Sequence, residues 1–251
     1  MARATDTVDA PPTRVGVSTA GLPSRYETRL DRIWRYAFDQ KIEEVMRPGV
    51  AVLDAGSGRA PAISRGARPA DCFYVGLDIS SSELEHAGPD AYDETWGRDL
   101  TVLEPALEER FDFVISLFLL EHVRPIDAAI ENMRLYLKPG GALIAQFAGG
   151  RSISGWLNRL LPHRAATELV RHLTVNRSSE NIFPAHYDRC YPSALLPTMA
   201  AWSSVDFTPQ YTGATHYFDF SDVARRLYLG IENQTLNRPD AATWYLITAV
   251  R

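Results

Sequence analysis

A short apolar run that ends in an acid and two glycines is the feature that most constrains this chain. Val52 and Leu53 supply a buried strand, Asp54 stands where the strand emerges, and Gly56 and Gly58 follow two residues apart. Because glycine has no Cβ, the backbone can turn tightly here and approach a bound molecule closely. The segment therefore predicts a strand followed by a ligand-binding loop in an α/β domain.

Two further acids follow apolar or short segments downstream. Asp78 closes the apolar run 73–77, and Asp99 precedes another apolar residue. An acid at the end of the second strand of a βαβ unit accepts hydrogen bonds from ribose hydroxyls. Apolar strands at 111–117 and 142–147 alternate with helical segments, which predicts a parallel sheet with helices on both faces.

These segments together resemble the class I S-adenosylmethionine-dependent methyltransferases, in the bacterial branch that methylates small molecules. The resemblance rests on VLDAGSGRA (52–60), YVGLDIS (74–80), GRDL (97–100), FDFVISLFLLEHV (111–123) and LKPGGALIAQF (137–147). It departs at Ala60, the third small position of the glycine motif, which Pro61 follows; a proline is tolerated in a helix's first turn, and we expect a short first helix. A dinucleotide-dependent oxidoreductase is the nearest alternative, but it would show the spacing G-x-G-x-x-G.

The resemblance implies an α/β fold with a Rossmann-like, doubly wound sheet of seven strands, the last antiparallel, and helical lid insertions. We expect a disordered leader at residues 1–20 and a single methyltransferase domain at 21–251. Long loops in compact domains are usually functional. The expected core is 48–148 and 190–251, with lid or substrate insertions at about 149–189 and 212–240. Apolar spacing predicts helices near 25–46, 191–201 and 220–231 and strands near 204–211 and 244–250.

The resemblance also implies a cofactor, S-adenosyl-L-methionine, and assigns residues to it. In chain order these are Asp54, Gly56, Ser57 and Gly58 at the methionine end and ribose, Asp78 at the ribose hydroxyls, Ile79 on the adenine, Asp99 at the adenine amino group, Leu100 beside that ring, and Leu117 near the sulfur. For each acid, the alternative is a helix N-cap or a solvated turn residue.

Three histidines are candidate general bases, because an unperturbed imidazole titrates near neutral pH. His122 follows the strand at 111–117, His186 precedes a predicted helix, and His216 lies in the second insertion. For His122 the alternative is a structural role in orienting the next helix; for the other two it is a surface position. Residues expected to contact the substrate are Tyr26, Phe118, Trp156, Tyr187 and Tyr217.

Composition argues against several other classes of protein. The net charge of −5 and the lack of any Lys and Arg run disfavour a nucleic-acid substrate, because phosphate contacts need a basic surface. The two cysteines, Cys72 and Cys190, have no His or Cys neighbours at metal-ligand spacing, so we expect no metal site. No apolar stretch is long enough for a membrane span. A cytoplasmic monomer or homodimer is expected.

The expected activity is S-adenosylmethionine-dependent transfer of a methyl group to a small organic metabolite, in the tailoring of secondary metabolites. Oxygen is the favoured acceptor atom, because it is the commonest and because several candidate bases are present. Residues 116–119 do not resemble the Asn-Pro-Pro-Tyr signature of many N-methyltransferases, which argues against an amide or nucleobase nitrogen. Two alternatives stay open: a catalyst of this fold that binds the cofactor but performs a non-methylating, cyclase-like reaction, and a non-catalytic cofactor-binding protein.

Overall fold

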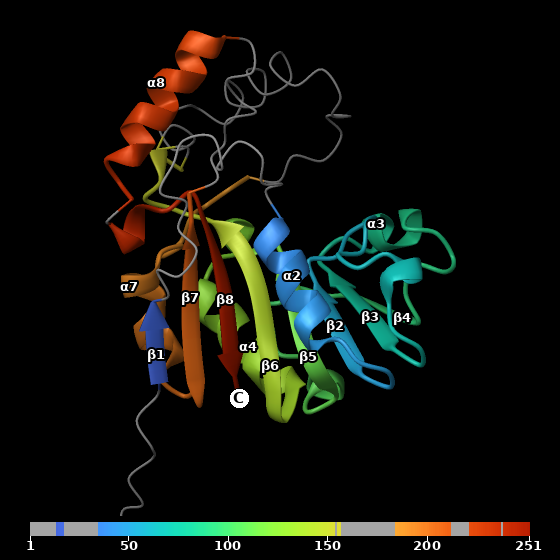
Figure 1. Ribbon diagram of the computed structural model, residues 1–251. Coiled ribbons are helices and arrows are strands. Elements are labelled where there is room, and N and C mark those ends of the chain that lie inside the picture. The colour runs from blue at the N-terminus through green and yellow to red at the C-terminus, as the bar shows by residue number, and fades with distance from the viewer. Residues whose placement is uncertain (1–13, 18–34, 154, 157–183, 212–220, 237) are drawn as a thin grey trace, which may run out of the picture.

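The computed structural model describes residues 14–17, 35–153, 155–156, 184–211, 221–236 and 238–251 (Figure 1). Its strands form one mixed sheet in the order β1-β7-β8-β6-β5-β2-β3-β4. The strands are β1 (Arg14–Val17), β2 (Ala51–Ala55), β3 (Phe73–Asp78), β4 (Glu94–Gly97), β5 (Phe111–Leu117), β6 (Leu137–Ala148), β7 (Ser204–Gln210) and β8 (Trp244–Val250). Strand β8 is antiparallel to both of its neighbours, β6 and β7, and the other pairs are parallel.

Helices connect these strands and cap the ends of the sheet. The α-helices are α2 (Tyr36–Val45), α3 (Ser81–His86), α4 (Ile126–Tyr136), α7 (Pro192–Leu195) and α8 (Asp222–Asn233). The 3-10 helices are η1 (Arg65–Ala67), η2 (Pro105–Leu107), η3 (Leu120–His122), η5 (Leu196–Met199) and η7 (Pro239–Ala241). Within the described ranges, none of these helices has the length and apolar character needed to cross a membrane.

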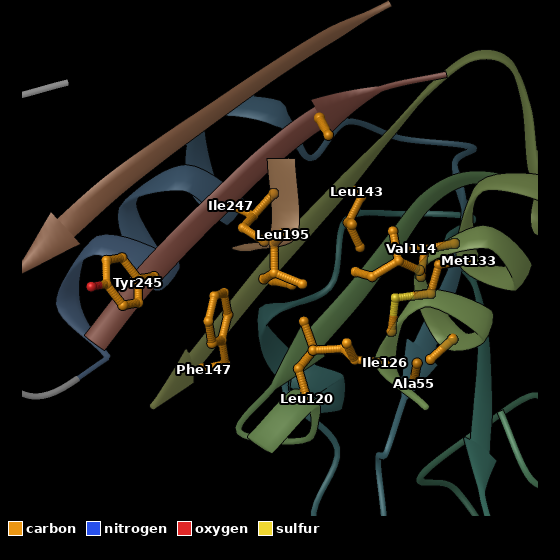
Figure 2. Packing of buried hydrophobic residues seen from close by; sticks show 14 of the residues in the cluster. Ala55, Val114, Leu120, Ile126, Met133, Leu143, Phe147, Leu195, Tyr245 and Ile247 are labelled. Carbon is orange, nitrogen blue, oxygen red and sulfur yellow. The ribbon is translucent and has the colours of Figure 1, made fainter. Parts of the chain in front are cut away.

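Both faces of the sheet are covered, which is the doubly wound arrangement. On one face, α2 contributes Phe38 and Ile42, which pack with Val52 and neighbouring strand residues. On the other, α4 and α7 bury a larger cluster (Figure 2). Members of that cluster include Ala55, Val114, Leu120, Ile126, Met133, Leu143, Phe147, Leu195, Tyr245 and Ile247. The central strands are therefore apolar on both sides, as a buried parallel sheet requires.

The order of the strands locates the place where a ligand would bind. Strand β2 pairs with β3 on one side and with β5 on the other, so the chain reverses its direction of winding there. In open α/β sheets, ligands bind outside the carboxyl ends of the strands at such a switch point. The segments that follow β2, β3, β4 and β5 lie at these carboxyl ends, and they carry most of the predicted site residues.

The predicted fold class is confirmed, with one strand more than expected. Residues 14–17, assigned from sequence to a disordered leader, form β1 and pair in parallel with β7, from Arg14 opposite Ser204 to Val17 opposite Phe207. That part of the leader prediction is wrong, because two valines favour extended backbone and the edge of β7 offers it hydrogen-bonding groups. The remaining leader residues lie outside the described ranges.

Two other segments differ in detail from their predictions. Between β2 and β3 the described chain contains only the 3-10 turn η1, so the short first helix expected from Pro61 is shorter still. The helix expected near 191–201 is divided into α7 and η5, with Pro197 in the first turn of η5. Much of the predicted lid insertions, 157–183 and 212–220, lies outside the described residues, so the lid assignment stays a prediction.

Candidate active site

The loop after β2 has the backbone that its glycines predicted. Gly56 and Gly58 adopt φ values of 75° and 51°, in the left-handed region that favours glycine. The Gly56 N–H donates to the Leu77 carbonyl over 2.7 Å, which holds the loop against the end of β3. The Ser57 hydroxyl is buried and has no hydrogen-bond partner among the described residues. The loop thus offers close backbone approach and one unsatisfied polar atom.

Gly56 is further constrained by Leu119, which lies against it. A Cβ at Gly56 would lie 2.7 Å from Leu119 Cδ1 and 2.9 Å from Leu119 Cβ. We therefore expect Gly56→Ala to lower the free energy of unfolding by about 2 kcal/mol, from positive-φ strain together with overpacking. Urea denaturation would measure this change, with Gly66→Ala as the control, since a Cβ at Gly66 would meet nothing within 4 Å. An equal effect of both substitutions would contradict the argument.

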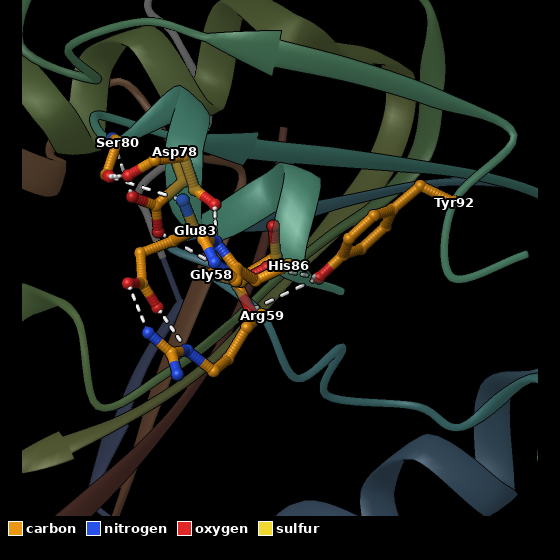
Figure 3. A network of polar contacts seen from close by, with 9 residues as sticks. Gly58, Arg59, Asp78, Ser80, Glu83, His86 and Tyr92 are labelled. Atoms are coloured by element: carbon orange, nitrogen blue, oxygen red, sulfur yellow. Dashed lines mark hydrogen bonds and ion pairs between the residues drawn. The ribbon is translucent and has the colours of Figure 1, made fainter. Parts of the chain in front are cut away.

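Asp78 lies at the carboxyl end of β3, where its carboxylate joins two segments of the site (Figure 3). Its Oδ1 accepts from the Ser80 N–H over 2.9 Å, and its Oδ2 accepts from the Gly58 N–H over 3.0 Å. Burial raises the pKa of Asp78, and the Glu83 charge adds to the rise, while both backbone bonds oppose it. The carboxylate is thus held at the sheet edge beside the glycine loop, where ribose hydroxyls were expected.

Asp54 is buried beneath the loop. Its Oδ2 accepts from the Ala62 N–H and from the Tyr74 hydroxyl, each over 2.7 Å. Burial raises the pKa of Asp54 to about 6, although both hydrogen bonds and the nearby Arg68 charge act to lower it. Asp54 therefore links the end of β2 to Ala62 and Tyr74 through hydrogen bonds. Its predicted contact with the methionine end of a cofactor stays a prediction.

The residues predicted to bind adenine are distributed between the surface and the core. Ile79 is 65% exposed at the end of β3, and Val102 is 64% exposed beyond β4, so apolar side chains face solvent there. Asp99 is exposed and accepts from the Thr101 N–H and hydroxyl, which is the turn role given above as its alternative. Leu100 is buried in the larger core cluster, and its predicted place beside the adenine ring stays a prediction.

The end of β5 carries an aromatic pair. Leu117 packs partly against the smaller core cluster. Phe118 adopts φ of 57°, which is uncommon for a bulky residue, and donates its N–H to the Gln146 carbonyl over 2.7 Å. Its ring meets Trp244 edge to face, with ring centroids 4.9 Å apart. Strained backbone of this kind clusters at functional sites, which is consistent with the substrate contact predicted for Phe118.

His122 and His186 are brought together although they are far apart in sequence. The His122 ring donates from Nδ1 to the Pro184 carbonyl over 3.1 Å, because a carbonyl can only accept. The N–H groups of His186 and Tyr187 both donate to the Glu121 carbonyl, over 2.7 and 2.9 Å. Segment 184–187 is thereby fixed on η3, and two of the three predicted bases share one end of the sheet.

The five remaining predicted residues have different outcomes. Tyr187 is buried in the larger core cluster, where its side chain serves packing. Trp156 is 56% exposed. Tyr26, His216 and Tyr217 lie outside the described residues. In the described part of the chain, no group of three or more His, Cys, Asp and Glu side chains is arranged to hold a metal ion.

Sequence reasoning missed the side chains that support the loop and η3. Arg59 forms two hydrogen bonds with Glu83, each 2.7 Å long. The Tyr92 hydroxyl donates to the carbonyls of Ser57 and Gly58, and burial raises its pKa. Glu121 is buried, and burial raises its pKa to about 7. Of these three features, only the Arg59–Glu83 pair had a signal in the sequence: an arginine in the glycine motif and a glutamate in the helix that follows β3.

Comparisons with known proteins agree with this geometry. Residues 53–143 match a family model described as a methyltransferase domain. A search of curated protein sequences found no match. Among solved structures, phosphoethanolamine N-methyltransferase 2 from Haemonchus contortus, in complex with phosphomonomethylethanolamine and S-adenosylhomocysteine, is similar at a TM-score of 0.51 and 16% identity, over 87% of this chain and 52% of that one. This chain therefore spans about half the length of that relative.

Two further structures are similar along most of their length. A SAM-dependent methyltransferase from Thermotoga maritima has a TM-score of 0.52 and 14% identity, over 86% of this chain and 89% of that one. The cyclase SpnF has a TM-score of 0.50 and 16% identity, over 88% of this chain and 84% of that one. At these identities the structural likeness shows the fold alone. The family match is independent of it and covers the glycine loop and the strands that follow. Residues 53–143 of this chain therefore match a methyltransferase domain within a methyltransferase-like fold, in agreement with the family that its sequence resembles.

Proposed function

We propose that this chain binds S-adenosyl-L-methionine and transfers its methyl group to a small organic metabolite at an oxygen atom. The observation that carries the proposal is the arrangement around Asp78. Its carboxylate lies at the switch point of the sheet, bonded to the loop residue Gly58 and followed by the exposed apolar Ile79. A charged acceptor for ribose hydroxyls beside an apolar surface for a base ring fits an adenosine group.

The loop after β2 fits the other end of this cofactor. Gly58 offers backbone without a Cβ, with Asp78 Oδ2 3.8 Å from where a Cβ would lie. Among the described residues, the Ser57 hydroxyl has no hydrogen-bond partner, and a ligand would supply one. When bound, the sulfonium supplies an activated methyl group. The protein's own tasks are then to align an acceptor and to remove its proton, and alignment alone contributes roughly 7–11 kcal/mol in favourable cases.

His122 is the favoured base on the acceptor side. Since its Nδ1 donates to the Pro184 carbonyl, the neutral ring has Nε2 as its acceptor nitrogen, which is the form a base requires. The Phe118 and Trp244 rings stand at the same end of the sheet and offer aromatic surface to an organic acceptor. The availability of a base is what favours oxygen, because a hydroxyl must lose its proton on methylation.

Calorimetry tests the cofactor part of the proposal. We expect the purified chain to bind both S-adenosylmethionine and S-adenosylhomocysteine at micromolar concentrations, and no binding of either would refute it. Product analysis by mass spectrometry with phenols, carboxylates and sugars then tests transfer. A rearranged, unmethylated product would instead support the cyclase-like alternative, for which the fold similarity to a cyclase is the motive. Binding without turnover on any acceptor would favour a non-catalytic role.

Replacing His122 tests the base. We expect His122→Ala to lower kcat about a hundredfold on an oxygen acceptor, with little change in cofactor affinity, because general base catalysis contributes on that scale. The dependence of kcat on pH should also differ between the variant and the wild type. His86→Ala is the matched control, since His86 is exposed and its ring donates to the Ser82 carbonyl within its own helix. Full turnover by His122→Ala would remove the residue from the catalytic set.

A further inference from the structure

We infer that Arg59 and Glu83 are positioning residues that hold the glycine loop against Asp78 and so preform the adenosine site. The inference rests on the proposed function. It concerns two side chains that the glycine motif does not specify, one directly after Gly58 and one in the first turn of α3. Neither residue is required to touch the cofactor.

The contacts form a closed ring around Asp78 (Figure 3). The Asp78 carboxylate accepts from Gly58 on one side and from Ser80 on the other. The Ser80 hydroxyl in turn accepts from the Glu83 N–H over 3.3 Å, which caps α3. The Arg59 guanidinium then joins the Glu83 carboxylate through two hydrogen bonds of 2.7 Å, which returns the ring to the loop. Removing the Arg59–Glu83 link opens this ring at the loop.

The Arg59–Glu83 ion pair has two parallel hydrogen bonds, which is the stronger geometry for such a pair. A planar guanidinium that meets both carboxylate oxygens fixes direction as well as distance. The Glu83 side chain is 11% exposed and the Arg59 side chain 45% exposed, so water screens the pair only partly. Gly58 lies between Asp78 and Arg59 in this arrangement, and the loop is thus tethered on both sides of its second glycine.

The charges make the two partners unequal. Glu83 raises the pKa of Asp78 through its own negative charge. Loss of Arg59 would therefore remove a cation that offsets the charge of a nearly buried acid, beside the acid proposed to bind ribose. Loss of the Glu83 charge would instead leave a half-exposed arginine in water. We expect Arg59→Ala to be the more damaging single change, and we expect Glu83→Gln to rescue part of its loss.

The experiment is calorimetry of S-adenosylhomocysteine binding to the full chain and to Arg59→Ala, Glu83→Gln and the double variant. We expect Arg59→Ala to weaken binding about tenfold, Glu83→Gln about threefold, and the double variant no more than Glu83→Gln alone. Hydrogen exchange without ligand gives a second measurement. The Gly58 amide should exchange about tenfold faster in Arg59→Ala, because its bond to Asp78 opens more often.

Arg110→Ala is the matched control, because Arg110 forms a similar two-bond pair with Glu94 on β4, over 3.1 and 2.8 Å. That variant should leave both the affinity and the Gly58 exchange rate unchanged. Binding by the wild type with additive losses, or with no loss in Arg59→Ala, would overturn the inference and leave the proposed function intact. No binding by the wild type would refute the proposed function, and the inference with it.

Discussion

Asp78→Ala is expected to weaken binding of S-adenosylhomocysteine about a thousandfold. The reason is that the variant would lose the two proposed hydrogen bonds to ribose hydroxyls, and each hydrogen bond to a charged group contributes about 1.5–3 kcal/mol. The substitution also removes the acceptor of the Gly58 and Ser80 N–H groups. Under the proposed function, both the ligand contacts and the shape of the site therefore depend on this carboxylate. Isothermal calorimetry at neutral pH would measure the loss directly.

A control separates this effect from general damage to the fold. Asp90→Ala removes the carboxylate of an exposed residue between α3 and β4, whose backbone carbonyl accepts a hydrogen bond from the Arg65 side chain. Its affinity should equal that of the wild type. Asp78→Asn should fall between the two, because it keeps the side-chain shape but loses the charge. Unchanged affinity in Asp78→Ala would remove the residue from the ribose site.

The second large effect concerns Glu121, whose replacement by glutamine should change how stability depends on pH. The Glu121 Oε1 accepts from the Ala148 N–H over 3.4 Å, and its Oε2 has no hydrogen-bond partner among the described residues. Burial raises its pKa from 4.5 to about 7. The folded protein thus holds a proton that the unfolded chain releases between these values. The contribution of Glu121 to the free energy of unfolding is therefore fully present below pH 4.5. It is lost as the pH rises through about 7, because the buried carboxyl must then ionise.

Because glutamine cannot ionise, the Glu121→Gln variant should not lose unfolding free energy at this position as the pH rises. Relative to the wild type, we expect Glu121→Gln to gain up to about 3 kcal/mol of unfolding free energy between acid pH and pH near 8. Urea denaturation of both proteins across this range measures the difference, and any constant cost of the amide cancels. Asp54 contributes a loss of the same sign at lower pH, since its pKa is raised from 3.8 to about 6, but it is common to both proteins. Parallel curves for the two proteins would contradict the assignment.

The sequence was informative where a function or a period restricts the choice of residues. The strand that carries Asp54, the glycines after it and the acid closing β3 each require a particular residue at a particular spacing. The structure has them together at the carboxyl ends of β2 and β3. The apolar run of β8 likewise predicted a strand, and its antiparallel pairing follows from the fold family. Strand β1 was missed, because four residues with two valines carry too short a pattern to distinguish from a leader.

The acceptor end of the site was harder to predict, since its contacts join distant parts of the chain. Nothing local in the sequence indicates that the His122 ring bonds to Pro184, or that Glu121 receives the N–H groups of His186 and Tyr187. The burial of Tyr187 and Leu100 likewise depends on tertiary packing and not on residue type. Side-chain chemistry suggested the candidates, and only the fold determines which of them meet.

The position of β8 also has a consequence for the order in which the molecule is made. Strand β8 follows every other strand in the chain, yet it lies between β6 and β7. While the chain leaves the ribosome, β2 to β6 can pair as soon as Ala148 has emerged, but β1 and β7 cannot join them. Until Trp244 and the residues after it appear, the nascent sheet keeps an unpaired edge along β6. Because an unpaired strand edge is a template for pairing with other extended chains, we expect this stage of synthesis to be the one most prone to aggregation.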